Sequence, residues 1–267
     1  MHSTILQLGP FVIRSYTLML SIAFLAGTLL AVRRARKHVI PPHEVVNFAV
    51  LIIIASIVGS RLLYVFEHLE TFSQHPEAMF FIWQGGLSFH GGLFLALIAA
   101  WWWLNNKKIS IGRMLDIFVP AMALGFFFVR IGCFLNGCCF GTPTDASWGV
   151  VFPSDSPAGW VFKDTAIHPT QLYSSFLGLI SFFILLVIER KMQLDDRNGL
   201  LFLFFLVLFA LWRFILEFFR YQGHNAITVA WFTEAQIYSV GILILSVTII
   251  TQIFRKKLND DILGKQA

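Results

Sequence analysis

Seven long apolar segments constrain this chain more than any other feature of its sequence. Each is long and apolar enough for a helix to cross a hydrocarbon core about 30 Å thick. They cover Phe11–Val32, Val45–Phe66, Leu87–Leu104, Met114–Leu135, Thr170–Ile188, Gly199–Phe219 and Trp231–Phe254. These segments and their connections use up the 267 residues, of which only 13% are charged. We therefore predict an all-α polytopic membrane protein with seven transmembrane helices, forming a single membrane domain over residues 1–267.

The basic residues indicate which way the helices run. Fourteen of the 20 Lys and Arg residues lie in four clusters, which follow the first, third, fifth and seventh segments. Cytoplasmic loops of membrane proteins carry the excess of Lys and Arg. We therefore predict an external N-terminus and a cytoplasmic C-terminus. The same clustering accounts for the net charge of +5 and argues against a nucleic-acid partner.

This topology places an unusual set of polar residues near the outer face. Arg61, Arg130 and Arg213 each lie shortly before the outer end of an outward helix, and His90 and Tyr16 lie near the outer starts of inward helices. Further polar residues at this level are Asn136, His168, Gln171, Tyr173, Glu217 and Arg220. Because a charge inside the hydrocarbon costs a few kcal/mol, such residues usually mark function. The sequence predicts a binding site in the outer leaflet.

The charges at this level favour an anionic ligand. A guanidinium offers a forked set of donors that suits phosphate. Arg213, Glu217 and Arg220 follow at spacings of four and three, so they share one helix face and can form pairs within it. One alternative is that this ladder satisfies itself, and another is that Arg130 pairs with a buried carboxylate. Glu217 alone cannot neutralise Arg61, Arg130 and Arg213, and we therefore favour an anion site.

The segment Gly85-Gly86-Leu87-Ser88-Phe89-His90-Gly91-Gly92 places a histidine between two glycine pairs at a helix start. One interpretation is that the glycines serve helix packing and His90 is a satisfied polar residue. The other is that the imidazole of His90 exchanges a proton near neutral pH. The glycines on both sides favour a functional histidine.

The longest connection, residues 136–169, is predicted to be external. It contains Trp148, Trp160 and several prolines and glycines, and its length without an apolar run predicts an ordered cap or a functional loop. His168-Pro169 then opens the fifth helix, because proline is favoured at an early helical position. His168 and Tyr173 are candidates for the lining of the site.

Three cysteines lie within seven residues, at Cys133, Cys138 and Cys139. Their thiolates and His168 could bind zinc, but two adjacent cysteines are poorly spaced for a four-ligand site. In an external setting Cys133 could form a disulfide with Cys138 or Cys139, or all three could remain unreactive thiols. These alternatives stay open, and we predict no metal and no cofactor.

Taken together, the motifs resemble those of the bacterial prolipoprotein diacylglyceryl transferases. The matching blocks occur in the family's order over nearly the whole chain: the region of Tyr16, Ser60-Arg61, G-G-L-S-F-H-G-G, R-I-G-x-F-x-N-G, H-P-T-Q-L-Y and R-F-I-L-E-F-F-R. The resemblance implies an inner-membrane enzyme of seven helices with a small periplasmic head. Such an enzyme moves the diacylglyceryl group of phosphatidylglycerol to the lipobox cysteine of a prolipoprotein signal peptide, with glycerol phosphate as the second product.

The resemblance also implies site residues. It assigns Tyr16, His90, Arg130, Gly141, Arg213 and Glu217 to the site, with Arg61, Asn136 and Arg220 in support. Arg130 and Arg213 would clamp the lipid phosphate, and His90 would help to deprotonate the acceptor thiol, since the thiolate is the nucleophile. Tyr16 and Asn136 would orient the head group.

The chain departs from the family pattern at several positions. The family commonly has glycine at Val129, asparagine at Cys133, glutamate at Cys138 and Ser174, and glycine at Ala235. These departures are compatible with a divergent paralogue that uses another acceptor or lipid. A non-catalytic lipid-binding membrane protein is a further alternative, and it would keep the arginines without needing His90.

Overall fold

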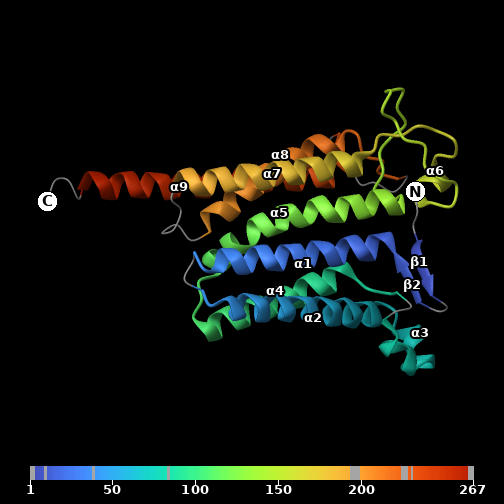
Figure 1. Cartoon of the computed structure of the whole chain (residues 1–267), viewed down its shortest axis with the longest axis horizontal. Helices are drawn as coiled ribbons and strands as arrows, with labels where there is room; N and C mark the ends of the chain where they lie inside the picture. Colours follow the sequence, from blue (N-terminus) through green and yellow to red (C-terminus); the bar gives the residue numbers. More distant parts are fainter. Residues whose placement is uncertain are drawn as a thin grey trace. The chain divides into compact units, whose positions relative to one another are not determined.

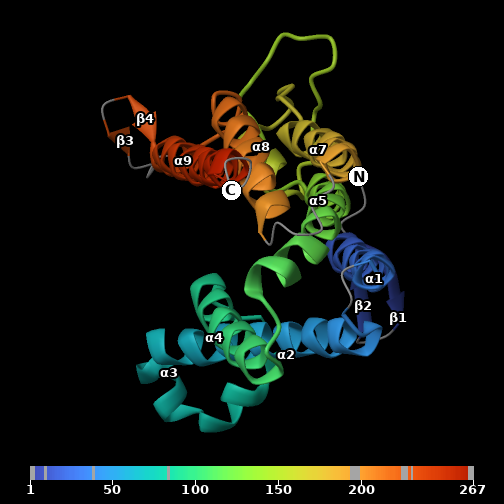
Figure 2. The same cartoon turned by 90° about the vertical axis from the view of Figure 1, so that its left-hand side faces the viewer.

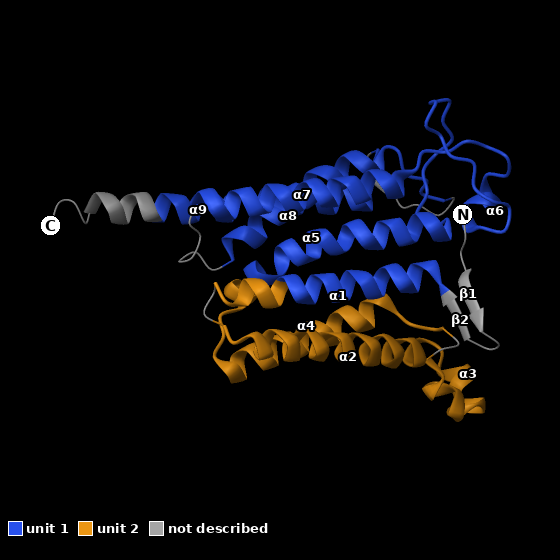
Figure 3. Ribbon diagram, viewed as in Figure 1, with its two compact units in different colours: residues 1–30, 115–267 blue, residues 31–114 orange. Residues whose placement is uncertain are grey.

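The computed structural model describes residues 4–8, 11–37, 40–82, 85–192, 199–223, 228–229 and 231–263. The chain divides into two compact units, one of residues 1–30 and 115–267 and the other of residues 31–114 (Figure 3). We refer to them as unit 1 and unit 2, and each is described by itself. The single domain over residues 1–267 stays a prediction.

Long helices account for most of the described chain (Figure 1). They are α1 Ser15–Ala35, α2 Pro42–Glu67, α4 Phe89–Lys107, α5 Ile111–Asn136, α7 Thr170–Met192, α8 Leu200–Glu217 and α9 Glu234–Leu263. Among the described residues six of these, all except α4, are long and apolar enough to cross a membrane. Helix α4 has 19 residues, but His90 near its start and Asn105 to Lys107 at its end lower its mean hydropathy. The chain is therefore a polytopic membrane protein, and the seventh crossing and the orientation stay predictions.

Two predicted helix starts are wrong. Strands β1 (Thr4–Leu8) and β2 (Phe11–Arg14) form an antiparallel hairpin, so the first helix begins at Ser15 and not at Phe11. The Gly-Pro pair between the strands is a turn signal, and the β-branched residues that follow it favour a strand. Helix α9 likewise begins at Glu234, after the short hairpin of β3 (Thr228–Val229) and β4 (Phe232–Thr233).

Unit 2 consists of the packed pair α2 and α4 with a short connection between them (Figure 2). The connection holds α3 (Leu69–Gln74) and the 3₁₀ helix η1 (Pro76–Phe80). A Cβ atom added to Gly59 would lie 2.6 Å from the Cβ of Leu95, and one added to Gly92 would lie 2.8 Å from the carbonyl oxygen of Ser56. These glycines therefore allow the close approach of the two helices, which is the packing role weighed for the glycine-rich segment.

In unit 1, α8 packs against both α7 and α9 (Figure 2). A buried apolar cluster joins α5, α7 and α8, and its members are Val119, Ala123, Leu185, Leu200, Leu201 and Phe205. At the same end of the helices, the Asp116 carboxylate accepts hydrogen bonds from the backbone N–H groups of Gly199 and Phe202, at 2.6 and 2.9 Å. An acceptor at a helix N-terminus stabilises it, so Asp116 fixes the start of α8.

Residues 137–169, which we call the head, connect α5 to α7 and have a small core of their own. Phe152, Ala158 and Ile167 are buried there, and α6 (Pro157–Val161) forms part of the segment. Isolated β-bridges link Pro143 and Val150 to Ile167. The head thus has contacts of its own, and both its role as a cap and its external location stay predictions.

Candidate active site

A pocket in unit 1 lies where α5 ends, α7 begins and α8 ends. It is lined by Arg130, Cys139, Thr170, Ser174, Trp212, Arg213, Leu216 and Arg220. Three of these residues are arginines, and none of the described residues that line the pocket is acidic. The structure thus brings together Arg130, Arg213 and Arg220 from among the predicted site residues.

Glu217 neutralises one of these arginines. It lies one helical turn after Arg213, is 5% exposed and forms an ion pair with the Nη1 of Arg213. The other oxygen of Glu217 accepts hydrogen bonds from Gln222 and from the hydroxyl of Thr233. Because both carboxylate oxygens are engaged in this way, Glu217 fixes the direction of Arg213 and leaves the other arginines of the pocket uncompensated.

Arg130 is the least satisfied of the three. Its Nε is buried and has no hydrogen-bond partner in the part of the chain that the structure describes. Buried polar groups are nearly always bonded, and an exception calls for an explanation such as a ligand. The pocket therefore has the donors and the charge to attract an anionic group.

Arg61 lies in unit 2 and is satisfied by backbone carbonyls. Its Nε donates to Met79 at 2.9 Å, Nη2 donates to Ala78 at 2.6 Å, and Nη1 donates to Gly85 and Gly86 at 2.8 Å each. Its guanidinium also lies 5.3 and 5.7 Å from the ring centroids of Phe72 and Tyr64. These contacts fix the connection that leads into α4, so Arg61 needs no anion to compensate it. They favour a structural role over the predicted contact with substrate.

His90 lies in the first turn of α4, in unit 2. It is exposed, and among the described residues no hydrogen bond holds its ring. The neighbouring Gly91 and Gly92 face α2, because a Cβ atom on either would collide with Gly59 or Ser60. The glycines thus serve packing, while the imidazole of His90 is available to exchange a proton.

Tyr16 and Asn136 mark the ends of two helices of unit 1. Tyr16 lies in the first turn of α1 and is partly exposed. Its Cα lies 3.3 Å from the position that a Cβ on Gly132 of α5 would take. Asn136 is the last residue of α5. Neither lines the pocket in this structure.

Gly141 holds three segments together next to the pocket. Its N–H donates to the His168 carbonyl at 3.1 Å, and the N–H of the next residue, Thr142, donates to Phe219 at 2.9 Å. A Cβ on Gly141 would lie 2.6 Å from the Phe219 carbonyl oxygen, so only glycine fits. Gly141 therefore supports the site by connecting the start of α7 to the end of α8.

His168 and Tyr173 bind each other within unit 1. The Tyr173 hydroxyl lies 3.2 Å from Nδ1 of His168 and accepts a hydrogen bond from Nε1 of Trp148 at 2.7 Å. The His168 ring also makes an edge contact with Phe219. These side chains join the head to α7 and α8, and neither of the two predicted residues lines the pocket.

Comparison with known proteins identifies the family of this chain. A family model described as prolipoprotein diacylglyceryl transferase matches residues 3–252. The chain belongs to the prolipoprotein diacylglyceryl transferase family. The resemblance of its motifs is thereby confirmed.

Full-length family members from distant bacteria align with this chain. The chain is 34% identical over 260 residues to the phosphatidylglycerol–prolipoprotein diacylglyceryl transferase of Stenotrophomonas maltophilia, covering 89% of this chain and 87% of that protein. The protein of the same name from Geobacter sulfurreducens is 32% identical, with 94% and 95% covered. That of Clostridium tetani is 30% identical, with 92% and 96% covered.

Several lining residues of this family member were not predicted. Thr170 and Ser174 lie one helical turn apart, and the Ser174 hydroxyl donates to the Thr170 carbonyl at 2.8 Å. Trp212 and Leu216 flank Arg213 on α8. The four-residue spacing of Thr170 and Ser174 could have indicated a shared face. The two apolar residues carry no comparable signal in a helix that is apolar all round.

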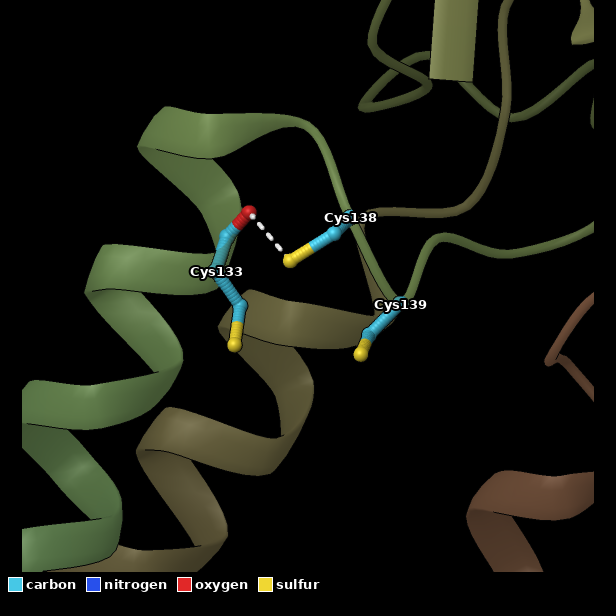
Figure 4. A group of neighbouring side chains, drawn as sticks. All are labelled: Cys133, Cys138 and Cys139. Atoms are coloured by element: carbon cyan, nitrogen blue, oxygen red, sulfur yellow. Dashed lines mark hydrogen bonds between the residues drawn. The ribbon is translucent and has the colours of Figure 1, made fainter. Parts of the chain in front are cut away.

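The three cysteines converge because of the way α5 ends (Figure 4). Gly137 takes a φ of 71°, and the N–H groups of Gly137 and Cys138 donate to Phe134 and Cys133 at 3.1 Å each. This is a Schellman ending, which brings together the side chains of the two residues that correspond to Cys133 and Cys138. The Cys138 thiol accordingly lies 3.7 Å from the Cys133 carbonyl oxygen.

Cys139 adds a third sulfur to this pair. Its φ of 58° is unusual for a residue other than glycine, and it turns the chain so that neighbouring side chains converge. All three cysteines are free thiols, so the disulfide considered from the sequence is not formed. The thiols of Cys133 and Cys138 and the guanidinium groups of Arg220 and Arg130 lower the pKa of the Cys139 thiol below its usual range.

Proposed function

We propose that this protein transfers the diacylglyceryl group of phosphatidylglycerol to the lipobox cysteine of a prolipoprotein and releases glycerol phosphate. The observation that carries this proposal is the pocket with three arginines and no acidic lining residue among those described. Such a pocket suits a lipid phosphate, and the family's named members act on phosphatidylglycerol and prolipoprotein. The pocket needs no cofactor for this reaction.

The reaction replaces a carbon–oxygen bond by a carbon–sulfur bond. The acceptor thiolate attacks the glyceryl carbon that bears the phosphate ester, and the ester oxygen leaves with the bonding electron pair. Negative charge therefore grows on the departing glycerol phosphate. Donors that are already positioned where charge develops lower the barrier most, and this is the role of Arg130 and Arg213. Glu217 holds Arg213 in place.

The acceptor must lose its proton before it attacks, because the thiolate is the nucleophile. We assign this step to His90, which takes the thiol proton and passes it to water. Two observations support the assignment: its ring is exposed without a hydrogen bond from the described residues, and its motif matches that of the family. An imidazole changes its charge near neutral pH, as the step requires.

The other predicted residues have supporting roles in this proposal. Arg220 adds charge to the pocket, and Tyr16 and Asn136 orient the head group of the lipid. Gly141 holds the ends of α7 and α8 together, while Arg61 fixes the connection into α4. His168 and Tyr173 tie the head to the helices and so shape the entrance for the substrate.

We further propose that the chain crosses the bacterial inner membrane seven times and that its pocket opens to the outer leaflet. The distribution of charge supports this orientation. Arg190 and Lys191 lie in the last turn of α7, whereas Thr170, at the opposite end of the same helix, lines the pocket. Arg33 and Arg34 lie in the last turn of α1, at the end opposite to Tyr16. Basic clusters of this kind mark the cytoplasmic side.

The test is a transfer reaction with purified protein in detergent. The protein is incubated with phosphatidylglycerol and a peptide that carries a lipobox cysteine, and mass spectrometry detects the thioether-linked diacylglyceryl group. A peptide with serine at that position is the control and should remain unmodified.

The alternatives give different results in the same assay. A paralogue with another donor would form the thioether only with a different lipid, such as phosphatidylethanolamine. A non-catalytic lipid-binding protein would bind phosphatidylglycerol and form no product. Either result would refute the proposed reaction.

A further inference from the structure

No step of the transfer reaction described above uses the thiol cluster of Cys133, Cys138 and Cys139, although Cys139 lines the arginine pocket. The sulfur atoms lie within 4.8 Å of one another, and all three side chains point into the same space (Figure 4). Among the described residues they form the only group of three or more Cys, His, Asp or Glu side chains with this geometry. Such convergence calls for a chemical explanation, because two of the residues are adjacent in sequence.

The backbone around the cluster is fixed from several directions. The Schellman ending of α5 sets Cys133 and Cys138 side by side. The Thr170 hydroxyl donates to the Cys139 carbonyl at 3.0 Å, and the Gln171 amide donates to the Cys138 carbonyl at 2.9 Å. Cys139 takes a left-handed backbone conformation, and such strain collects at functional sites. The cluster is therefore a built arrangement and not a chance contact of mobile side chains.

The spacing of the sulfur atoms suits a thiophilic metal ion. Zinc–sulfur bonds of about 2.3 Å place the sulfur atoms of a tetrahedral site about 3.8 Å apart. The observed separations of up to 4.8 Å come within about 1 Å of this value, which small rotations of the side chains can supply. Adjacent residues such as Cys138 and Cys139 can both serve in a site with three protein ligands. Such a site leaves the fourth position on the metal open.

The surroundings add a second, independent indication. Gln171 is fully buried, and its side-chain oxygen has no hydrogen-bond partner among the described residues. Its amide nitrogen donates a hydrogen bond to the Cys138 carbonyl. A polar ligand on a metal could satisfy that oxygen. The charge is also favourable, because three thiolates and a divalent cation carry one net negative charge. Arg220 lines the same pocket as Cys139 and can compensate that charge.

We propose that Cys133, Cys138 and Cys139 form a three-thiolate site for a thiophilic metal ion of the zinc type, next to the arginine pocket. The proposal goes beyond the transferase activity, because the metal can be measured on the protein without lipid or acceptor. It also replaces our expectation from the sequence that the chain holds no metal.

The experiment measures metal binding by the full-length protein in detergent, kept reduced with a phosphine. After addition of zinc and removal of the excess, we expect one zinc per chain and protection of the three thiols from alkylation. Cobalt in place of zinc should give thiolate-to-metal charge transfer and the intense visible bands of a tetrahedral ion. Calcium and magnesium, which prefer oxygen ligands, should not compete.

Single Cys→Ser variants at the three positions decide which residues bind. Groups outside the first ligand shell are already worth roughly 10- to 100-fold in metal affinity. Loss of one sulfur should therefore weaken zinc binding by more than about 100-fold. Met122→Leu removes another sulfur from α5, at an exposed position away from the cluster, and should bind zinc as the unchanged protein does.

Three results would overturn the proposal. They are zinc at well below one equivalent, zinc that all three Cys→Ser variants retain, and thiols that form a disulfide and gain no protection from zinc. Transferase activity enters none of these readouts. The metal site and the proposed reaction can therefore fail separately.

Discussion

Arg130 and Arg61 are the same residue type, yet the structure predicts different effects on stability when each is replaced by alanine. Arg61 donates to four backbone carbonyls, and its removal takes one donor from each of them, although the Ala78 carbonyl still accepts from the N–H of Phe81. Each hydrogen bond to a charged group is worth about 1.5–3 kcal/mol, but such values do not add, and exposed carbonyls recover water. We expect Arg61→Ala to lower the free energy of unfolding by about 3–5 kcal/mol.

Arg130 has a buried Nε without a partner and shares its pocket with two other arginines. Its removal relieves an unsatisfied donor and the repulsion between like charges. We expect Arg130→Ala to leave the stability unchanged or to raise it by about 1 kcal/mol. Transfer activity should fall by about 100-fold or more, which is the usual effect of removing one donor to a developing charge.

Thermal unfolding in detergent, followed by tryptophan fluorescence, measures both effects. A change of 1 kcal/mol moves the midpoint by roughly 2–4 °C for a chain of about this size. Arg61→Ala should therefore lower the midpoint by about 6–20 °C, while Arg130→Ala lowers it by nothing measurable. If Arg130→Ala instead unfolds as early as Arg61→Ala, Arg130 is a structural residue. The pocket is then not an anion site.

Three further predictions concern other parts of the chain. Gly141→Ala should destabilise the protein by about 1–3 kcal/mol in thermal unfolding, because the new Cβ would lie 2.6 Å from the Phe219 carbonyl oxygen. The control is Gly241→Ala in α9, where the new Cβ has open space and the change should be neutral or stabilising. His90→Ala should abolish thioether formation and leave the protein's binding of phosphatidylglycerol largely intact. Equal loss of transfer and of lipid binding would argue for a structural histidine. Asp116→Ala removes the acceptor of the Gly199 and Phe202 N–H groups at the start of α8 and should lower the free energy of unfolding by about 1 kcal/mol. An unchanged midpoint in thermal unfolding would show that these two hydrogen bonds do not stabilise α8.

The helices could be predicted from the sequence because long apolar runs leave few alternatives to a membrane span. The predicted starts of α1 and α9 were too early, because a short strand with apolar residues of its own comes directly before each helix. The fourth segment was predicted to end at Leu135 and α5 ends at Asn136, because Gly137 readily takes the left-handed conformation found there.

The partners of the arginines could not be predicted from the sequence in the same way. In the sequence Arg61 and Arg130 look alike, because only carboxylates can be recognised there as partners of an arginine. The carbonyls that satisfy Arg61 belong to the connection before α4, and they point at it only once that connection has folded. The convergence of all three thiols could not be predicted for a related reason: the sequence shows two adjacent cysteines but not the φ of 58° at Cys139 that brings their side chains together.

The two parts of the proposed chemistry lie in different compact units of the chain. The phosphate clamp of Arg130 and Arg213 belongs to unit 1, where Glu217 and the head fix it before any ligand arrives. His90 belongs to unit 2, on a helix whose glycines set its packing against α2. Because each part is held by its own unit, substitutions in one should not disturb the fold of the other. Lipid binding should therefore follow the arginines and turnover should follow His90, and the two losses should be separable by measurement.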